Sequence, residues 1–287
     1  MGTLFDWITD WIKQGLIDAV TSQFTTMFES VNTQVKDVAV QVGQTPESWN
    51  PGVFSMIKTL SETVVIPIAG VILTFIACYE LISMIVERNN MHDFEPSKIV
   101  QWVFKTAIAT IVLTNCFPIV MGIFEIAQHV INESATVING TLDLQAQLTD
   151  LQTQLEAMSM WELIGLWLEM NIINLCLSAL GIFVFVVTWG RIIEIYMMVS
   201  LAPIPLSTMG NSEWRSLGNN YLKSLFAVGF QGFLIMVCLA IYAALIQSIT
   251  SAANIHAAIW GTVGYTVLLC FAMMKTGGLA KSIFGAH

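Results

Sequence analysis

Charged side chains are scarce in the long apolar runs of this 287-residue chain, so each one found there is a candidate for function. Arg191 and Glu194 stand three residues apart, a spacing that allows an ion pair on one face of a helix. Pro203 and Pro205 follow in the next apolar run, and proline interrupts a helix because it lacks the backbone N–H. The pattern predicts that the Arg191–Glu194 pair beside a broken helix is structurally essential.

Other polar side chains also fall within these runs or at their ends. They indicate either a polar cavity or pore lining, or hydrogen bonds between helices with long side chains reaching to the membrane surface. For each residue taken singly, we favour the second interpretation. The candidate intramembrane polar or pore-associated residues are Glu80, Lys105, Asn115, Glu169, Asn171, Asn174, Arg191 and Glu194.

No catalytic or nucleotide-binding signature accompanies these residues. The sequence contains no glycine-rich loop ending in Lys-Ser/Thr, no HExxH and no GxSxG motif. The five cysteines lie in apolar runs without a CxxC pair, which is typical of small buried hydrophobes. We therefore expect neither an enzyme nor a cofactor or metal site, and the energy for any transport would come from a partner.

The composition identifies the class of protein. Hydrophobic residues make up 55% of the chain and charged residues only 11%, against about 25% charged in soluble domains. Five apolar stretches are long enough to cross a membrane as helices, which predicts an all-α polytopic membrane protein. A sixth stretch, Ile195–Met209, is short and holds two prolines, so we expect a broken or re-entrant segment packed on protein. The expected spans are Thr63–Tyr79, Thr106–Phe124, Met170–Gly190, Ser224–Ile246 and Ala257–Met274.

The eleven Lys and Arg residues predict the orientation. If the sixth stretch does not cross and the N-terminus lies outside, most of them are cytoplasmic, as the positive-inside rule requires. If it does cross and the N-terminus lies inside, the cations divide seven against four, and four of them flank the outer ends of the spans. We therefore expect five spans, an external N-terminus and a cytoplasmic C-terminus. The cations placed in the cytoplasm are Arg88, Lys98, Lys105, Arg191, Arg215, Lys223, Lys275 and Lys281.

The N-terminal residues predict an amphipathic helix over residues 3–31, in which apolar side chains recur at helical spacing. Such a helix could lie at the membrane surface, or it could pack on the protein's own spans or on a neighbouring copy. The pattern leaves these alternatives open. The predicted apolar face comprises Leu4, Ile8, Trp11, Ile12, Leu16, Val20, Phe24, Met27, Phe28 and Val31.

These elements divide the chain into an external amphipathic region, 1–57, and a transmembrane domain, 58–287. We expect an external helical linker at 132–160 and cytoplasmic loops at 87–101 and 210–223. The linker carries a two-heptad apolar seam that hints at oligomer contact, although packing within one chain is the favoured explanation for so short a seam. The seam comprises Leu144, Leu148, Leu151, Leu155 and Met158.

Several long strings resemble the TrbL (VirB-six-like) inner-membrane proteins of conjugative type IV secretion systems, particularly the branch carried by Gram-positive mobile elements. The strings cover most of the chain, and the linker 132–160 is the least distinctive part. They are QVGQTPESWN (41–50), SETVVIPIAGVILTF (61–75), NNMHD (89–93), WVFKT (102–106), GRIIEIYMMVSLAPIPLSTMGNSEW (190–214), NYLKSLFAVGFQGFLIMVCLAIYAALIQSI (220–249) and KTGGLAKSIFGAH (275–287).

The resemblance implies an integral component of a DNA-transfer machine in a bacterial plasma membrane. Members of the family are associated with cytoplasmic ATPases and other channel subunits, and Gram-negative relatives form rings such as pentamers. It therefore implies an oligomeric subunit, in contact with membrane lipids, that forms or frames the path of a DNA–relaxase substrate. The Gram-negative relatives often carry a larger external domain that this chain lacks.

Two other functions remain open. A non-conducting scaffold could anchor the ATPases and the external subunits, and the scarcity of cations in the spans favours it, because a pore for phosphates should be positively lined. A small-molecule transporter ranks behind both. The odd number of spans and the lack of a repeat of broken helices argue against it.

Overall fold

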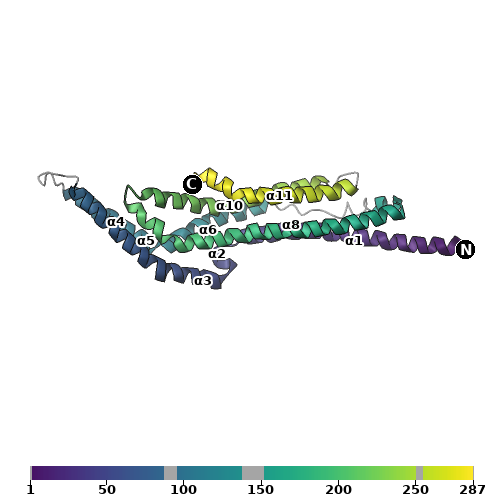
Figure 1. Ribbon diagram of the computed structural model, residues 1–287, viewed down its shortest axis with the longest axis horizontal. Coiled ribbons are helices and arrows are strands. Elements are labelled where there is room, and N and C mark those ends of the chain that lie inside the picture. The colour runs from purple at the N-terminus through teal and green to yellow at the C-terminus, as the bar shows by residue number, and fades with distance from the viewer. Residues whose placement is uncertain (1, 87–95, 138–151, 250–254, 287) are drawn as a thin grey trace. The chain divides into compact units, whose positions relative to one another are not determined.

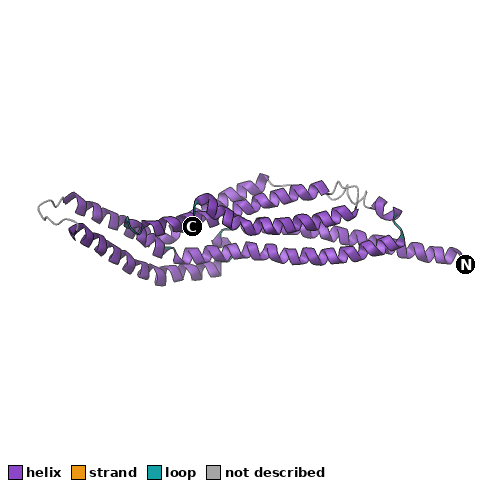
Figure 2. Cartoon of the chain, turned by 45° about the horizontal axis from the view of Figure 1, so that its top comes forward, coloured by secondary structure: helices purple, strands orange, loops and turns teal. Residues whose placement is uncertain are grey.

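The computed structural model describes residues 2–86, 96–137, 152–249 and 255–286. Throughout these stretches the chain is helical, and the helices are joined by short turns without any strand (Figure 2). Long apolar segments form helices because this is how a chain satisfies its backbone hydrogen bonds within a membrane. The predicted all-α class is confirmed.

Figure 1 labels most helices of the described residues, and the elements follow here in chain order. They are α1 (Gly2–Val42), α2 (Pro46–Trp49), α3 (Pro51–Leu60), the π-helical turn η1 (Ser61–Val65), α4 (Ile66–Val86), α5 (Pro96–Thr114), α6 (Cys116–Val137), α8 (Met160–Leu201), α9 (Pro203–Ser207), the 3-10 turn η3 (Thr208–Gly210), α10 (Arg215–Ile249) and α11 (Ile255–Phe284).

Four helical stretches in the described residues are long and apolar enough to cross a membrane, and a bent helix pair can supply a fifth crossing. This agrees with the prediction of about five spans. The stretches are Pro51–Val86, Met160–Gly210, Arg215–Ser248 and Ile255–Phe284, with α5 and α6 forming the bent pair.

The structure adds a bend to the second predicted span and corrects the end of the third. The second span is not a straight helix, because α5 and α6 meet at Asn115 with a bend of 67°. The third span does not end at Arg191, because α8 continues without a break to Leu201 and joins the apolar stretch that was predicted to be separate. A charged residue marks the end of a span only when its charge must reach water, and Arg191 is buried.

Prolines account for the three irregular points of these helices. Pro118 has no N–H to donate to the carbonyl of Thr114, and its ring clashes with that carbonyl. The helix therefore bends between Thr114 and Cys116. Pro203 begins α9 directly after the break at Ala202. The π-helical turn η1 ends just before Pro67, and its wider backbone ring accommodates the missing donor.

The chain forms two compact units, and α6, α8, α10 and α11 contribute residues to both. The first unit contains α1 and the segments 134–188 and 235–275. The second contains the segments 43–133, 189–234 and 276–287.

In the first unit, α1 extends to Val42, beyond the predicted range of residues 3–31. Its apolar residues do not all lie on one face of the helix. Residues spaced four apart advance by about 40° around a helix at each step, so the row winds around α1. The later part of α1 therefore packs on the protein, and membrane-surface contact stays a prediction for its first turns. Within the predicted face, Val20, Phe24, Met27, Phe28 and Val31 are buried, whereas Ile8, Trp11 and Ile12 are exposed.

In the second unit, the Pro-x-Pro element α9 packs against α4 and α5. Ile204 of α9 lies against a small core formed by Ala69, Leu73, Ala109 and Leu113. The buried hydroxyls of Ser207 and Thr208 donate to the carbonyls of Ile204 and Pro205 at 2.7 and 2.8 Å. Irregular backbone at membrane depth is stable only when protein covers it, and that condition is met here. That the segment does not cross the membrane stays a prediction.

The linker seam lies mostly outside the described residues, which include neither Leu144, Leu148 nor Leu151. Leu155 is buried and Met158 is half-buried in the first unit. The contact between neighbouring copies through this seam stays a prediction. The assignment of residues 1–57 to the external side of the membrane also stays a prediction.

Candidate functional site

Arg191 is the most deeply buried cation among the described residues, with only 4% of its surface exposed. Its Nε donates to the carbonyl oxygen of Val228 at 3.3 Å, and Nη2 donates to that of Gly229 at 3.2 Å. Both acceptors belong to α10. A buried guanidinium stays charged and is tolerable only with such polar partners. Arg191 therefore fastens α8 to α10.

A glycine makes this close approach possible. A Cβ atom at Gly232 would lie 2.7 Å from Nη2 of Arg191, closer than carbon atoms normally approach, and would also press on Ile131 of α6. Gly232 thus leaves the space that the guanidinium occupies. The sequence signal is a pair of glycines three residues apart, Gly229 and Gly232, in an apolar stretch of the chain.

Glu194 does not take Arg191 as its direct partner. Its Oε1 lies 3.2 Å from Nζ of Lys281 on α11, and both side chains are partly exposed. The i, i+3 spacing allowed a pair within α8, but the partners of both residues lie on other helices. Because exposed ion pairs contribute little, the buried guanidinium is the stronger contact.

Gln231 provides a further polar contact that the sequence did not single out. Its buried Nε2 donates to Oγ1 of Thr276 on α11 at 3.3 Å. Gly277 stands beside it, and a Cβ there would lie 3.3 Å from the same nitrogen. Arg191, Glu194, Gln231, Thr276 and Lys281 therefore form a polar layer, named here the Arg191 layer, that joins α8, α10 and α11 in the second unit. An amide inside an apolar helix was the available signal.

The turn before the first predicted span is attached to α8 by aromatic residues. Tyr196 donates its hydroxyl to the carbonyl of Pro46 at 2.6 Å. Trp49 packs edge-on against Trp189, with ring centroids 4.8 Å apart, and also contacts Tyr196 at 5.8 Å. Thr45 caps α2 by accepting from the backbone N–H of Ser48.

Glu80 and Lys105 join α4 to α5 through an ion pair of 3.2 Å. Trp102 supports the same contact, because its Nε1 donates to the carbonyl of Ala77 at 3.1 Å. Lys105 is more than half exposed. That its ammonium reaches the membrane surface stays a prediction. Asn115 instead turns to its own helix, donating from Nδ2 to the carbonyl of Ile111 at 2.9 Å.

In the first unit, Glu169 joins α8 to α11. Its Oε2 lies 2.7 Å from Nδ1 of His256, and its Oε1 accepts from the indole of Trp260. Asn171 is exposed and donates to the carbonyl of Trp167 on its own helix at 2.7 Å. Asn174 is half-buried. Glu169, Asn171 and Asn174 are thus near in sequence without sharing a contact, and the predictions did not include His256.

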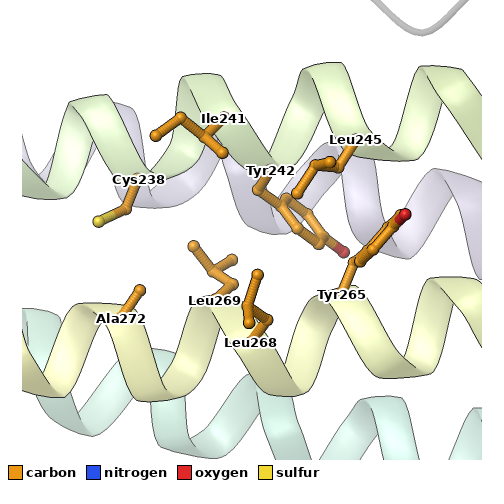
Figure 3. Close-up of a pocket in the computed structure, with 8 residues that line it drawn as sticks. All are labelled: Cys238, Ile241, Tyr242, Leu245, Tyr265, Leu268, Leu269 and Ala272. Atoms are coloured by element: carbon orange, nitrogen blue, oxygen red, sulfur yellow. The ribbon is translucent and has the colours of Figure 1, made fainter.

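A shallow apolar groove lies between α10 and α11 in the first unit (Figure 3). The hydroxyl of Tyr242 is not available to a ligand in the groove, because it forms a hydrogen bond with Oγ1 of Thr266 at 2.8 Å. A cavity of about 60 Å³ is far smaller than an ordinary ligand pocket. It is lined by Cys238, Ile241, Tyr242, Leu245, Tyr265, Leu268, Leu269 and Ala272.

The polar contacts hold helices together and offer little for a reaction. Among the described residues, no three or more His, Cys, Asp or Glu side chains form a group that could hold a metal ion. Residues 31–203 match the family model described as TrbL/VirB6 plasmid conjugal transfer like protein, which covers more than half of the chain. No curated protein and no solved structure matches the chain.

Proposed function

The chain belongs to the TrbL/VirB6 plasmid conjugal transfer-like family, and from this premise we propose that it is an oligomeric plasma-membrane subunit that forms or frames a transfer path. The family and the membrane-spanning helices make it a membrane component of conjugal transfer. The proposal adds that several copies assemble with other secretion subunits, including cytoplasmic ATPases, around a DNA–protein substrate.

The observation that carries this proposal is the family match over residues 31–203, a stretch that contains both Pro-broken helix junctions. At the second junction, after Ala202, α9 packs against α4 and α5. Broken helices occur in membranes where protein covers the break or where the break lines a water-filled cavity. Here α4 and α5 cover it, so the family match carries the proposal and the broken helix is compatible with it.

The orientation is part of the proposal. Charge counting puts the N-terminus outside and the C-terminus in the cytoplasm. Two cations placed on the inner side, Lys105 and Lys281, are partly exposed beside glutamates, as expected for side chains near a membrane surface.

A non-conducting scaffold is the second candidate, and one observation favours it. Arg191 points its guanidinium at backbone carbonyls of α10, while Lys105 and Lys281 are paired with Glu80 and Glu194. None of these three cations is therefore available as a single charge for phosphates. Binding of nucleic acid normally depends on such charges.

The test uses donor cells in which the gene is deleted and then restored in trans. Transferring DNA is fixed to nearby proteins with formaldehyde, and the chain is precipitated through a C-terminal tag. Recovery of the transferred strand only when the ATPases are active supports a path. Recovery of other subunits without the strand, at normal complementation, supports the scaffold, and unimpaired transfer after deletion would refute both.

A further inference from the structure

Helix α1 has one face that is buried in the first unit and one that is not. The buried face includes Val20, Phe24, Met27 and Val31. The opposite face carries exposed polar side chains at alternating intervals of four and three residues from Ser22 to Lys36, which keeps them on one side of the helix, and Asp37 lies next to Lys36. We call this face the polar stripe; it comprises Ser22, Thr26, Glu29, Thr33, Lys36 and Asp37.

Two contacts place α1 beside α8 and parallel to it. Nζ of Lys13 donates to the carbonyl of Glu156 at 2.8 Å, just before α8 begins. Further along, the side chain of Gln34 occupies the space that a Cβ would fill at Gly181. The polar stripe therefore runs beside the part of α8 that holds the predicted span Met170–Gly190.

The neighbouring helices show apolar faces at this same level. Leu175 and Ile182 of α8 are 73% and 65% exposed, and Phe271 of α11 is 63% exposed. Cys270 of α11 is level with Leu180 of α8, because its Sγ lies 3.7 Å from that carbonyl. The outward faces of α8 and α11 thus suit lipid, and the outward face of α1 does not.

Charge decides what the polar stripe can face. The hydroxyl of Thr26 donates to the carbonyl of Ser22 at 2.9 Å, so this side chain satisfies itself within the helix. A bond to the helix's own backbone does not neutralise the charges of Glu29, Lys36 and Asp37. A charged residue in the middle of a bilayer costs roughly 2.5–3.5 kcal/mol on insertion scales. Exposed charges at this level therefore require water.

We propose that the polar stripe of α1 lines a water-filled passage beside the lipid-facing helices of this protein. As the lining of a substrate path, it rests on the proposed function; as a water-facing surface, it rests on the geometry alone. The stripe carries two acidic groups and one basic group. A nearly neutral hydrophilic wall lets a charged chain pass without holding it, as conduction requires.

The proposal differs from the charge-based prediction that places all of residues 1–57 outside. It keeps the N-terminus outside and puts residues 22–37 level with the third predicted span. A stripe in open external water would be accessible to reagents of any size, whereas a stripe in a confined passage would exclude large ones.

The experiment introduces single cysteines by Ser22→Cys, Thr26→Cys and Thr33→Cys into the full chain in native membranes. Leu175→Cys and Ile182→Cys are the lipid-facing controls, and Asp10→Cys reports open water. Each is treated with a small cationic methanethiosulfonate or with a bulky polyethylene-glycol maleimide, and labelling of each peptide is read by mass spectrometry. The native cysteines remain in place.

We expect the stripe cysteines to react with the small reagent at least about tenfold faster than the α8 controls, because the hydrated thiolate is the reactive form. They should resist the bulky reagent, which labels Asp10→Cys. Slow reaction at all stripe positions, or equal reaction with both reagents, would overturn the proposal. Since labelling does not depend on DNA transfer, its outcome is independent of the strand-recovery test.

Discussion

The guanidinium of Arg191 lies against Gly232, so closely that a methyl group on the glycine would come within 2.7 Å of Nη2. This relationship lets a charged residue of α8 reach backbone carbonyls of α10. It also explains how an arginine can be buried within the long apolar helix α8. Two backbone carbonyls accept hydrogen bonds from its guanidinium in place of water.

Adding a methyl group at Gly232 should separate α8 from α10. We expect Gly232→Ala to destabilise the protein by about 1–3 kcal/mol, because the guanidinium and Ile131 must both move. The thermal unfolding midpoint in lipid nanodiscs measures the effect. Gly264→Ala, where no atom lies within 4 Å of the new Cβ, is the matched control. Equal midpoints for the two variants would show that the contact is loose.

Lysine should not replace Arg191. A single ammonium cannot reproduce the planar fork that reaches the carbonyls of Val228 and Gly229, so Arg191→Lys should cost about 1–3 kcal/mol although the charge is kept. Arg215→Lys, at an exposed site, should change stability by less than about 0.5 kcal/mol. A lysine variant as stable as the parent would mean that charge alone matters.

Removing the hydroxyl of Tyr196 should loosen the turn that precedes α3. Tyr196→Phe loses the hydrogen bond to the carbonyl of Pro46 while keeping the ring contact with Trp49, at a cost of about 1 kcal/mol. Limited proteolysis around residues 43–50 should become faster, with little change in the global midpoint. Tyr265→Phe serves as the control, because its partly exposed ring borders the small groove of Figure 3. Unchanged cleavage would argue that the rings alone hold the turn.

The topology has a direct test at Leu217, an exposed residue near the start of α10. If the N-terminus is external and the chain crosses as the charges predict, a cysteine introduced by Leu217→Cys lies in the cytoplasm. It should resist a membrane-impermeant thiol reagent in intact cells and react after permeabilisation. Labelling in intact cells would contradict the predicted orientation.

Hydropathy was sufficient to predict the helices, because a membrane leaves few alternatives to them. It did not predict where α8 ends, since charge at Arg191 suggested a boundary and only tertiary packing shows that α10 accepts the charge. The bend at Asn115 could have been predicted from the sequence, because Pro118 cannot bond to the carbonyl of Thr114, four residues earlier.

The contacts of the candidate residues were harder to predict than the residues themselves. Glu194 could pair within its own helix or with another, and spacing alone cannot choose between Arg191 and Lys281. His256 is far from Glu169 in sequence, so their contact depends on how α11 packs against α8. The polar stripe of α1 became visible only when exposure on each face was known.

Imaging of the full-length protein in lipid nanodiscs tests the central claim most directly, because it gives both the number of copies and the content of the space between them. We predict a closed ring whose centre is free of lipid and bordered by polar side chains. Single copies, or rings whose centre is filled with lipid in every particle, would contradict a subunit that forms or frames a transfer path.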